Sequence, residues 1–268
     1  MDFIPDIVEA QRLVKYKSFS RYSQAYISTN ESLRTSMKLM PKNCNRALVI
    51  AGSGDHPLFA SLYGAENVDT FDISYNAKCI MDIKTVAISR LKRSEYLDLL
   101  ENLLLADDIR AIPNMKKVSK KLSPVEFKYL CSMNGYFVFN HSGGRGVKGN
   151  VFLPNDKEYN KLQEIVTQPY NFIMADLSEL CGHLTDTYDF IHLSNVFDYI
   201  RDPGYQTMLL LDLLKYLNLD GRIVIQHLCV DPWTCAPVPM NTFASKQKVK
   251  NWKFFRINGD ISVFERVR

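Results

Sequence analysis

The residues best suited to chemistry form a short glycine-rich stretch, Gly52-Ser53-Gly54-Asp55-His56, which directly follows the apolar run ALVIA. Glycines in such a turn let the backbone approach a ligand closely, and a helix that follows offers free N–H groups at its start. Asp72 ends the next apolar run, where an acid commonly accepts hydrogen bonds from the ribose hydroxyls of a nucleoside. Together these features predict a site for a nucleoside-containing cofactor, whereas the glycines alone could serve a tight turn.

Two further residues near this pattern each have two interpretations. Asp176 ends another apolar run, MAD, where its side chain could meet the edge of an adenine. An acid at that position also often caps the helix that follows a strand. His56 could lie near the cofactor or simply stand at the start of its helix.

Five β-branched or aromatic runs predict the buried strands that must position these residues. They are Ala47–Gly52, Val68–Ile73, Asn171–Asp176, Asp189–Ser194 and Arg222–Leu228. Near-continuous apolar runs are typical of a parallel sheet that helices cover on both faces. A helical pattern from Gln206 to Leu217 lies between the last two runs, as a crossover between parallel strands requires.

The C-terminus departs from this alternation of strands and helices. Lys253–Ile257 and Asp260–Val267 read as strands, and Asn258-Gly259 between them favours the tight turn of a β-hairpin. A mostly parallel α/β sheet that ends in an antiparallel hairpin is the pattern of the class I methyltransferase-like (Rossmann-like) fold. We therefore predict that fold rather than a plain dinucleotide-binding domain.

Two regions lie outside the predicted sheet. Residues 1–40 are expected to form a helical cover over the site entrance, and residues 41–268 the cofactor-binding domain. That domain is interrupted by an insertion over 85–167, which opens with a helical pattern after the second strand. Because added segments longer than about 15 residues are seldom idle in compact domains, we expect the insertion to bind the acceptor substrate.

Composition narrows the class of protein. The 268 residues, 46% hydrophobic and 23% charged, suffice for a well-packed globular protein. The net charge of +4 permits an anionic ligand, but the basic stripe of a stable nucleic-acid partner is missing. With no apolar run near the ~20 residues of a membrane helix and no signal-peptide core, we expect a cytoplasmic protein without membrane insertion. Six scattered cysteines favour reduced structural thiols over a zinc site or disulfides.

The glycine-rich stretch is not a G-x-G-x-x-G motif, so it resembles S-adenosylmethionine-binding proteins more than NAD enzymes. Ile50 stands in place of the usual acid and His56 in place of the usual third glycine. The segments RYSQAYISTNESL, AGSGDHPLF, NVDTFDISYNAKCIMDIKTVAISRL and SEYLDLL carry a narrower resemblance. Over residues 20–105 the chain resembles the S-adenosylmethionine:diacylglycerol 3-amino-3-carboxypropyltransferases of betaine-lipid synthesis. The positions that match this family are Gln24, Gly54, Asp55, Asp72, Asn76 and Lys84.

This resemblance implies a reaction other than methylation. A nucleophile attacks the Cγ carbon of the methionine chain of S-adenosylmethionine, and methylthioadenosine leaves. The sulfonium activates all three attached carbons, so placement decides which one reacts. No metal is implied. The residues expected to grip the amino-acid end of the cofactor are Ser53, Asp55, Tyr22, Gln24, Ser194 and Asn195.

The nature of the acceptor is predicted from the insertion. Its glycine-rich segment HSGGRGVKGN offers Arg145 and Lys148 as a cradle for a phosphate. The same transfer occurs in the maturation of the peptide-nucleotide antibiotic microcin C, where the acceptor is a phosphate oxygen. An ionised phosphate needs no strong general base, whereas a hydroxyl acceptor would need one, for which His141, Asp198 or Tyr199 could serve.

Two other functions stay open at this point. The chain could be an S-adenosylmethionine-dependent methyltransferase on a small molecule, with S-adenosylhomocysteine as its product. It could also be a non-catalytic nucleotide-binding module, since the usual acid is absent at Ile50. A module of that kind would bind the cofactor weakly and be indifferent to Asp72→Ala.

Overall fold

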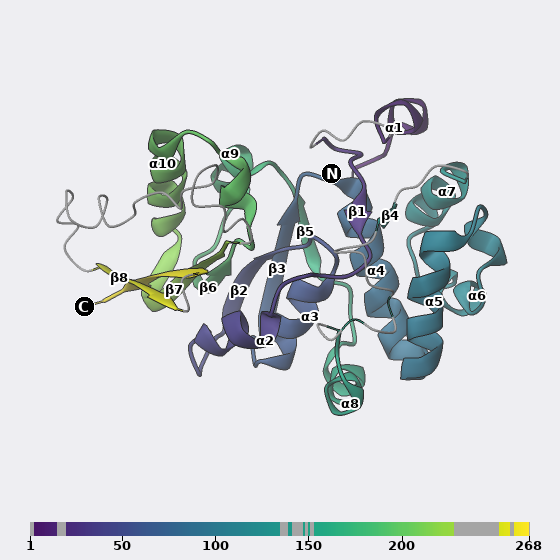
Figure 1. Ribbon diagram of the computed structural model, residues 1–268, viewed down its shortest axis with the longest axis horizontal. Coiled ribbons are helices and arrows are strands. Elements are labelled where there is room, and N and C mark those ends of the chain that lie inside the picture. Colours follow the sequence, from purple (N-terminus) through teal and green to yellow (C-terminus); the bar gives the residue numbers. More distant parts are fainter. Residues whose placement is uncertain are drawn as a thin grey trace.

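The computed structural model describes residues 3–14, 20–134, 139–140, 147, 150, 153–227, 252–257 and 260–267. Within these ranges, seven strands form one sheet (Figure 1). In sheet order they are β5 (Asn171–Met174), β3 (Asn67–Asp72), β2 (Arg46–Ile50), β6 (Tyr188–His192), β7 (Leu217–Gln226), β9 (Ile261–Arg266) and β8 (Trp252–Ile257).

The direction of the strands confirms the predicted fold class. The first five in sheet order run parallel, β9 pairs antiparallel with β7, and β8 pairs antiparallel with β9. The chain proceeds from β2 outward to β3 and β5, then returns to β6 on the other side of β2. This is the class I methyltransferase-like arrangement. Its switch point lies between β2 and β6, where α/β sheets of this kind bind ligands at their carboxyl ends.

Helices cover both faces of the sheet (Figure 1). They are α1 (Ile7–Leu13), α2 (Leu33–Ser36), α3 (Asp55–Leu62), α4 (Tyr75–Arg90), α5 (Arg93–Leu105), α6 (Met115–Ser119), α7 (Pro124–Ser132), α8 (Asp156–Ile165), α9 (Leu177–Leu180) and α10 (Pro203–Leu214). Ala47 and Val49 of β2 belong to the core that contains α3, α4 and α8, whereas Leu48 between them belongs to the core that contains α9 and α10. This alternation explains why the strands read as continuous apolar runs.

Each predicted strand overlaps an observed one, and the hairpin strands pair as expected, with Ile257 opposite Ile261. The turn residues Asn258-Gly259 lie outside the described residues. The predicted crossover helix ends at Leu217, but α10 is shifted towards the N-terminus. It begins at Pro203 because Asp202 accepts hydrogen bonds from the first N–H groups and proline suits the first helical position.

The helical prediction for residues 1–40 is only partly correct. Helices form over α1, α2 and a 3₁₀ turn at Met37–Leu39, but the described residues from 20 to 32 are not helical. There Ala25–Tyr26 (β1) pairs in parallel with Phe139–Asn140 (β4). The segment is rich in Ser, Thr and Asn, whose side chains compete for backbone hydrogen bonds; for example, Thr29 Oγ1 accepts from the N–H of Glu31 at 3.0 Å.

The expected insertion begins later than its predicted boundary. Residue 85 lies inside α4, which is the crossover helix between β3 and β5 and continues to Arg90. The added helices α5, α6 and α7 follow it, and α8 leads back to β5. No helix in the described part of the chain is long and apolar enough to cross a lipid bilayer.

Candidate functional site

A cavity of about 690 Å³ lies at the carboxyl ends of the central strands. Its lining comes from the turns after β2, β3, β5 and β6 and from the N-terminal segment between Ser23 and Glu31. The segments meet there because carboxyl ends of parallel strands share one edge of the sheet. The predicted site residues that line the cavity are Gln24, Gly52, Ser53, Asp72, Asp176, Ser194, Asn195 and Tyr199.

The two glycines of the motif have different roles, one at the cavity and one in helix packing. Gly52 lines the cavity with φ +51°, and its N–H donates to Asp72 Oδ2 at 2.9 Å. Gly54 adopts φ +79° and is absent from the lining. A Cβ added to Gly54 would lie 2.8 Å from Met81 Cα, so this glycine allows α3 to start close against α4.

Asp72 ends β3 at the edge of the cavity. Its side chain lines the cavity and accepts from the N–H of Gly52 on one oxygen and of Ser74 on the other, each at 2.9 Å. Burial raises the pKa of Asp72 above its usual value, although these backbone N–H groups oppose the shift. The N–H of Ile73 also contacts this carboxylate. Because a carboxylate can accept about four hydrogen bonds, one position remains for a hydroxyl donor.

Asp176 caps a helix and also lies at the cavity. It caps α9 by accepting hydrogen bonds from the N–H and the hydroxyl of Ser178, at 2.8 and 2.7 Å. Its side chain also lines the cavity. The cap is therefore observed, and the adenine contact stays a prediction.

Asp55 and Tyr22 lie outside the cavity lining. Both side chains of the Asp55–Lys84 ion pair are 0% exposed, with Oδ1 and Nζ 2.6 Å apart, and Asp55 Oδ2 accepts from the N–H of Thr29 and from Ser53 Oγ. Burial lowers the pKa of Lys84, and the charge of Asp55 opposes this. Asp55 thus ties the N-terminal segment to α4. The Tyr22 hydroxyl accepts from the N–H of Asp6 at 2.8 Å.

The three candidate bases are placed differently. Tyr199 lines the cavity and is 54% exposed. Asp198 is absent from the lining: its Oδ1 lies 2.9 Å from His227 Nδ1, and His227 Nε2 lies 3.2 Å from Ser262 Oγ. His141 lies outside the described residues, as do the predicted phosphate-binding residues Arg145 and Lys148.

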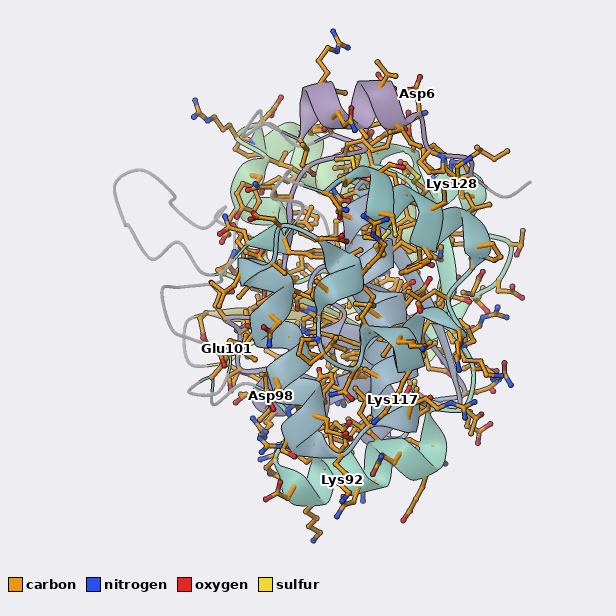
Figure 2. All side chains as sticks on the ribbon, turned by 90° about the vertical axis from the view of Figure 1, so that its right-hand side faces the viewer. Asp6, Lys92, Asp98, Glu101, Lys117 and Lys128 are labelled. Atoms are coloured by element: carbon orange, nitrogen blue, oxygen red, sulfur yellow. The ribbon has the colours of Figure 1, made fainter. Side chains whose placement is uncertain are left out.

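The lysine run before this region is solvated. Lys116, Lys117, Lys120 and Lys121 are all exposed, and Lys117 forms an ion pair with Glu95 at 3.0 Å. Figure 2 shows this side of the molecule, with Lys117 on α6 and Lys128 on α7. The run therefore serves as a charged helix face rather than as part of the cavity.

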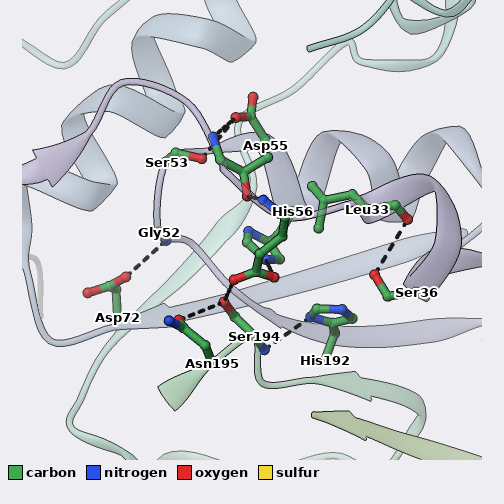
Figure 3. A network of polar contacts seen from close by, with 12 residues as sticks. Leu33, Ser36, Gly52, Ser53, Asp55, His56, Asp72, His192, Ser194 and Asn195 are labelled. Carbon is green, nitrogen blue, oxygen red and sulfur yellow. Dashed lines mark hydrogen bonds and ion pairs between the residues drawn. The ribbon is translucent and has the colours of Figure 1, made fainter. Parts of the chain in front are cut away.

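Glu31, which carries no signal in the sequence, joins His56 and Ser194 in a buried cluster at the cavity (Figure 3). Glu31 is 3% exposed, its Oε2 lies 3.2 Å from His56 Nε2, and its Oε1 accepts from Ser194 Oγ. Burial raises the pKa of Glu31, but His56, His192 and Ser194 together outweigh it, so the pKa of Glu31 is lowered. His192 accepts from the N–H of Ser194, and burial lowers the pKa of His192 to about 3.

The charges of the lining are of one sign. Glu31, Asp72 and Asp176 line the cavity, whereas its lining among the described residues includes neither lysine nor arginine. Such a surface favours a cationic ligand over a pyrophosphate. Within the same described ranges, no group of three His, Cys, Asp or Glu side chains is arranged to hold a metal ion.

No family model matches the chain, and no curated protein matches it. Among solved structures it is similar to an rRNA methylase from Streptococcus thermophilus, with 8% identity, a TM-score of 0.41, and 90% of this chain and 100% of that chain covered. It is also similar to the N-methyltransferase NodS from Bradyrhizobium japonicum WM9 in complex with S-adenosyl-L-homocysteine, with 9% identity, a TM-score of 0.42, and 97% of both chains covered. The rRNA methyltransferase aviRa from Streptomyces viridochromogenes has 13% identity, a TM-score of 0.43, and 93% and 87% coverage.

Proposed function

We propose that this chain transfers the 3-amino-3-carboxypropyl group of S-adenosylmethionine to a soluble, phosphate-bearing acceptor of the peptide-nucleotide kind and releases methylthioadenosine. The observation that carries the proposal is the acidic cavity at the carboxyl ends of the central strands, where the N–H of Gly52 donates to Asp72. S-adenosylmethionine combines a ribose, which suits Asp72, with a sulfonium cation, which suits carboxylates. A dinucleotide would bring a pyrophosphate to the same acidic lining.

The choice of the aminocarboxypropyl group is supported by the resemblance over residues 20–105. In this reaction a phosphate oxygen attacks Cγ, the Cγ–S bond breaks, and its electron pair neutralises the sulfonium as methylthioadenosine leaves. A phosphate is already ionised, so the step needs no general base. This agrees with the position of Asp198, which contacts His227 and lies outside the cavity lining.

Methyl transfer is the second candidate, because the same fold and the same acidic cavity would hold the same sulfonium. The two reactions differ only in which carbon faces the acceptor. They are told apart by the nucleoside that remains, since methyl transfer yields S-adenosylhomocysteine.

Mass spectrometry of the nucleoside product tests the proposal. The purified chain is incubated with S-adenosylmethionine and a nucleotide-linked peptide that ends in a phosphate. Asp72→Ala serves as the control for spontaneous breakdown of the cofactor. Methylthioadenosine above that background, together with an acceptor heavier by one aminocarboxypropyl group, is the expected result. S-adenosylhomocysteine with a methylated acceptor would establish the second candidate instead.

A further inference from the structure

Glu31 has acceptor capacity that the protein itself does not use. Glu31, His56 and Ser194 come from distant parts of the chain and all line the cavity. Each Glu31 oxygen takes part in one hydrogen bond, with Ser194 or with His56. Because a carboxylate oxygen can accept two hydrogen bonds, one position on each oxygen remains for a donor.

His56 holds the Glu31 carboxylate from one side. Its Nε2 contacts Glu31, an acceptor, so in the neutral ring the hydrogen lies on Nε2 and Nδ1 is an acceptor. Nδ1 is buried and has no hydrogen-bond partner within the described residues. A Cβ added to Gly52, which lines the cavity, would lie 3.7 Å from this nitrogen. The two nitrogens of an imidazole point in widely different directions, so a donor bound at Nδ1 would not also contact the Glu31 oxygen at Nε2. The acceptor positions open to one ligand group are therefore those of Glu31.

This cluster is separate from the nucleoside-binding acid. Asp72 ends β3 and Ser194 follows β6, and β2 lies between these strands in the sheet. Two strand spacings, about 10 Å, therefore separate what we call the Asp72 end and the Glu31 end of the cavity. A ligand with two polar ends joined by a flexible chain fits this layout, whereas a nucleoside alone fits one end.

We propose that Glu31, held by His56 and Ser194, binds the α-ammonium group of the methionine chain of S-adenosylmethionine. The inference rests on the proposed function and deepens it, because holding the ammonium group decides which carbon faces the acceptor. An ammonium group has three N–H donors, two of which match the open position on each Glu31 oxygen. Hydrogen bonds between two charged groups are among the strong ones.

This arrangement explains why Ile50 and His56 replace the usual acid and third glycine of the cofactor motif. Ile50 leaves no acid before the glycines, and Glu31 supplies a carboxylate from the N-terminal segment instead. His56, where a third glycine is usual, is the residue that holds it. The lowered pKa of Glu31 makes it a weak proton acceptor, so the cluster is better suited to hold a cation than to act as a base.

Calorimetric titration with three nucleosides tests the inference. S-adenosylmethionine and S-adenosylhomocysteine carry the ammonium group, and methylthioadenosine lacks it. We expect Glu31→Gln to raise the Kd for the first two about tenfold or more and to leave the Kd for methylthioadenosine within about twofold. Asp72→Asn is the matched control, because it should weaken all three ligands alike. Ser194→Ala, which keeps the carboxylate, should weaken only the first two, by about threefold.

The outcomes separate the two proposals. Equal weakening of all three ligands by Glu31→Gln would mean that Glu31 only shapes the cavity, and unchanged affinities would mean that it does not touch the ligand; both overturn the inference and leave the proposed function intact. If Glu31→Gln does not fold, Ser194→Ala decides by the same comparison. Failure of the wild-type chain to bind any of the three would remove both proposals.

Discussion

The two ends of the cavity are built in different ways. At the Asp72 end, Gly52 and Asp72 follow neighbouring strands, β2 and β3, and contact each other directly. At the Glu31 end, a residue of the N-terminal segment meets the start of α3 and the end of β6. The first end follows from strand pairing alone, whereas the second needs a segment that is not part of the sheet. Its position is maintained by contacts such as that between Asp55 and Thr29.

The strongest effect is expected from a substitution that removes the buried ion pair between Asp55 and Lys84. Lys84→Ala should lower the free energy of unfolding by about 3–5 kcal/mol, because it leaves the buried carboxylate of Asp55 without its partner. Chemical denaturation measures this. The double variant Lys84→Met/Asp55→Asn removes both charges and should recover most of the loss. A single variant as stable as wild type would show that the pair does not hold the segment.

Asp72→Ala tests the role of the Asp72 end of the cavity in binding the ribose. It should weaken binding of S-adenosylmethionine and of methylthioadenosine by about 1–3 kcal/mol each, because both share the ribose whose hydroxyls Asp72 is predicted to accept. Calorimetry on the two ligands provides the measurement. Unchanged affinity for both would contradict the ribose role.

Lowering the pH should decrease the free energy of unfolding, because the buried ring of His192 resists protonation. The pKa of His192 is about 3 in the folded chain, against an ordinary value of 6.5, so the unfolded chain binds the extra proton first. Stability is therefore present above pH 6.5 and is lost as the pH falls towards 3. Between pH 7.5 and 5.5 the expected loss is about 1.4 kcal/mol.

The contribution of His192 is isolated by repeating these unfolding measurements on His192→Gln. That variant keeps an acceptor for the N–H of Ser194 but has no titrating ring. Its stability should change less over the same pH range. The lowered pKa of Glu31 places its own loss of stability below its ordinary value of 4.5, outside the range measured. Equal slopes for the two proteins would assign the pH dependence to other groups.

The smallest effect concerns the acceptor and neither end of the cavity. Arg145→Ala should raise KM for a phosphate-bearing acceptor about fivefold, through the loss of a charged hydrogen bond, and spare S-adenosylmethionine affinity. Steady-state kinetics with varied acceptor provide the test. Lys117→Ala, an exposed residue paired with Glu95, is the control of like charge. Indistinguishable kinetics for the two variants would remove the phosphate cradle.

Several features could be predicted from local sequence because local physics controls them. The buried strands show in runs such as ALVI, since both of their faces are covered. Gly52 and Asp72 could be paired from their order in a strand–turn–helix pattern. For Asp176 the sequence allowed two roles, helix capping and ligand binding, and could not rank them. The structure shows the cap.

Other features depended on contacts between distant residues. Asp55 looks like part of the glycine motif, but burial against Lys84 of α4 removes it from the lining. Glu31 and His56 carry no local signal of their partnership, because they lie 25 positions apart on segments that meet only in the folded chain. The sheet, its crossovers and the contact between Gly52 and Asp72 follow from local sequence, since apolar periodicity and turn chemistry act over a few residues. Which acids are buried, which are paired and which face the cavity follows from long-range contacts, because burial and charge pairing depend on neighbours that come together only in the folded chain.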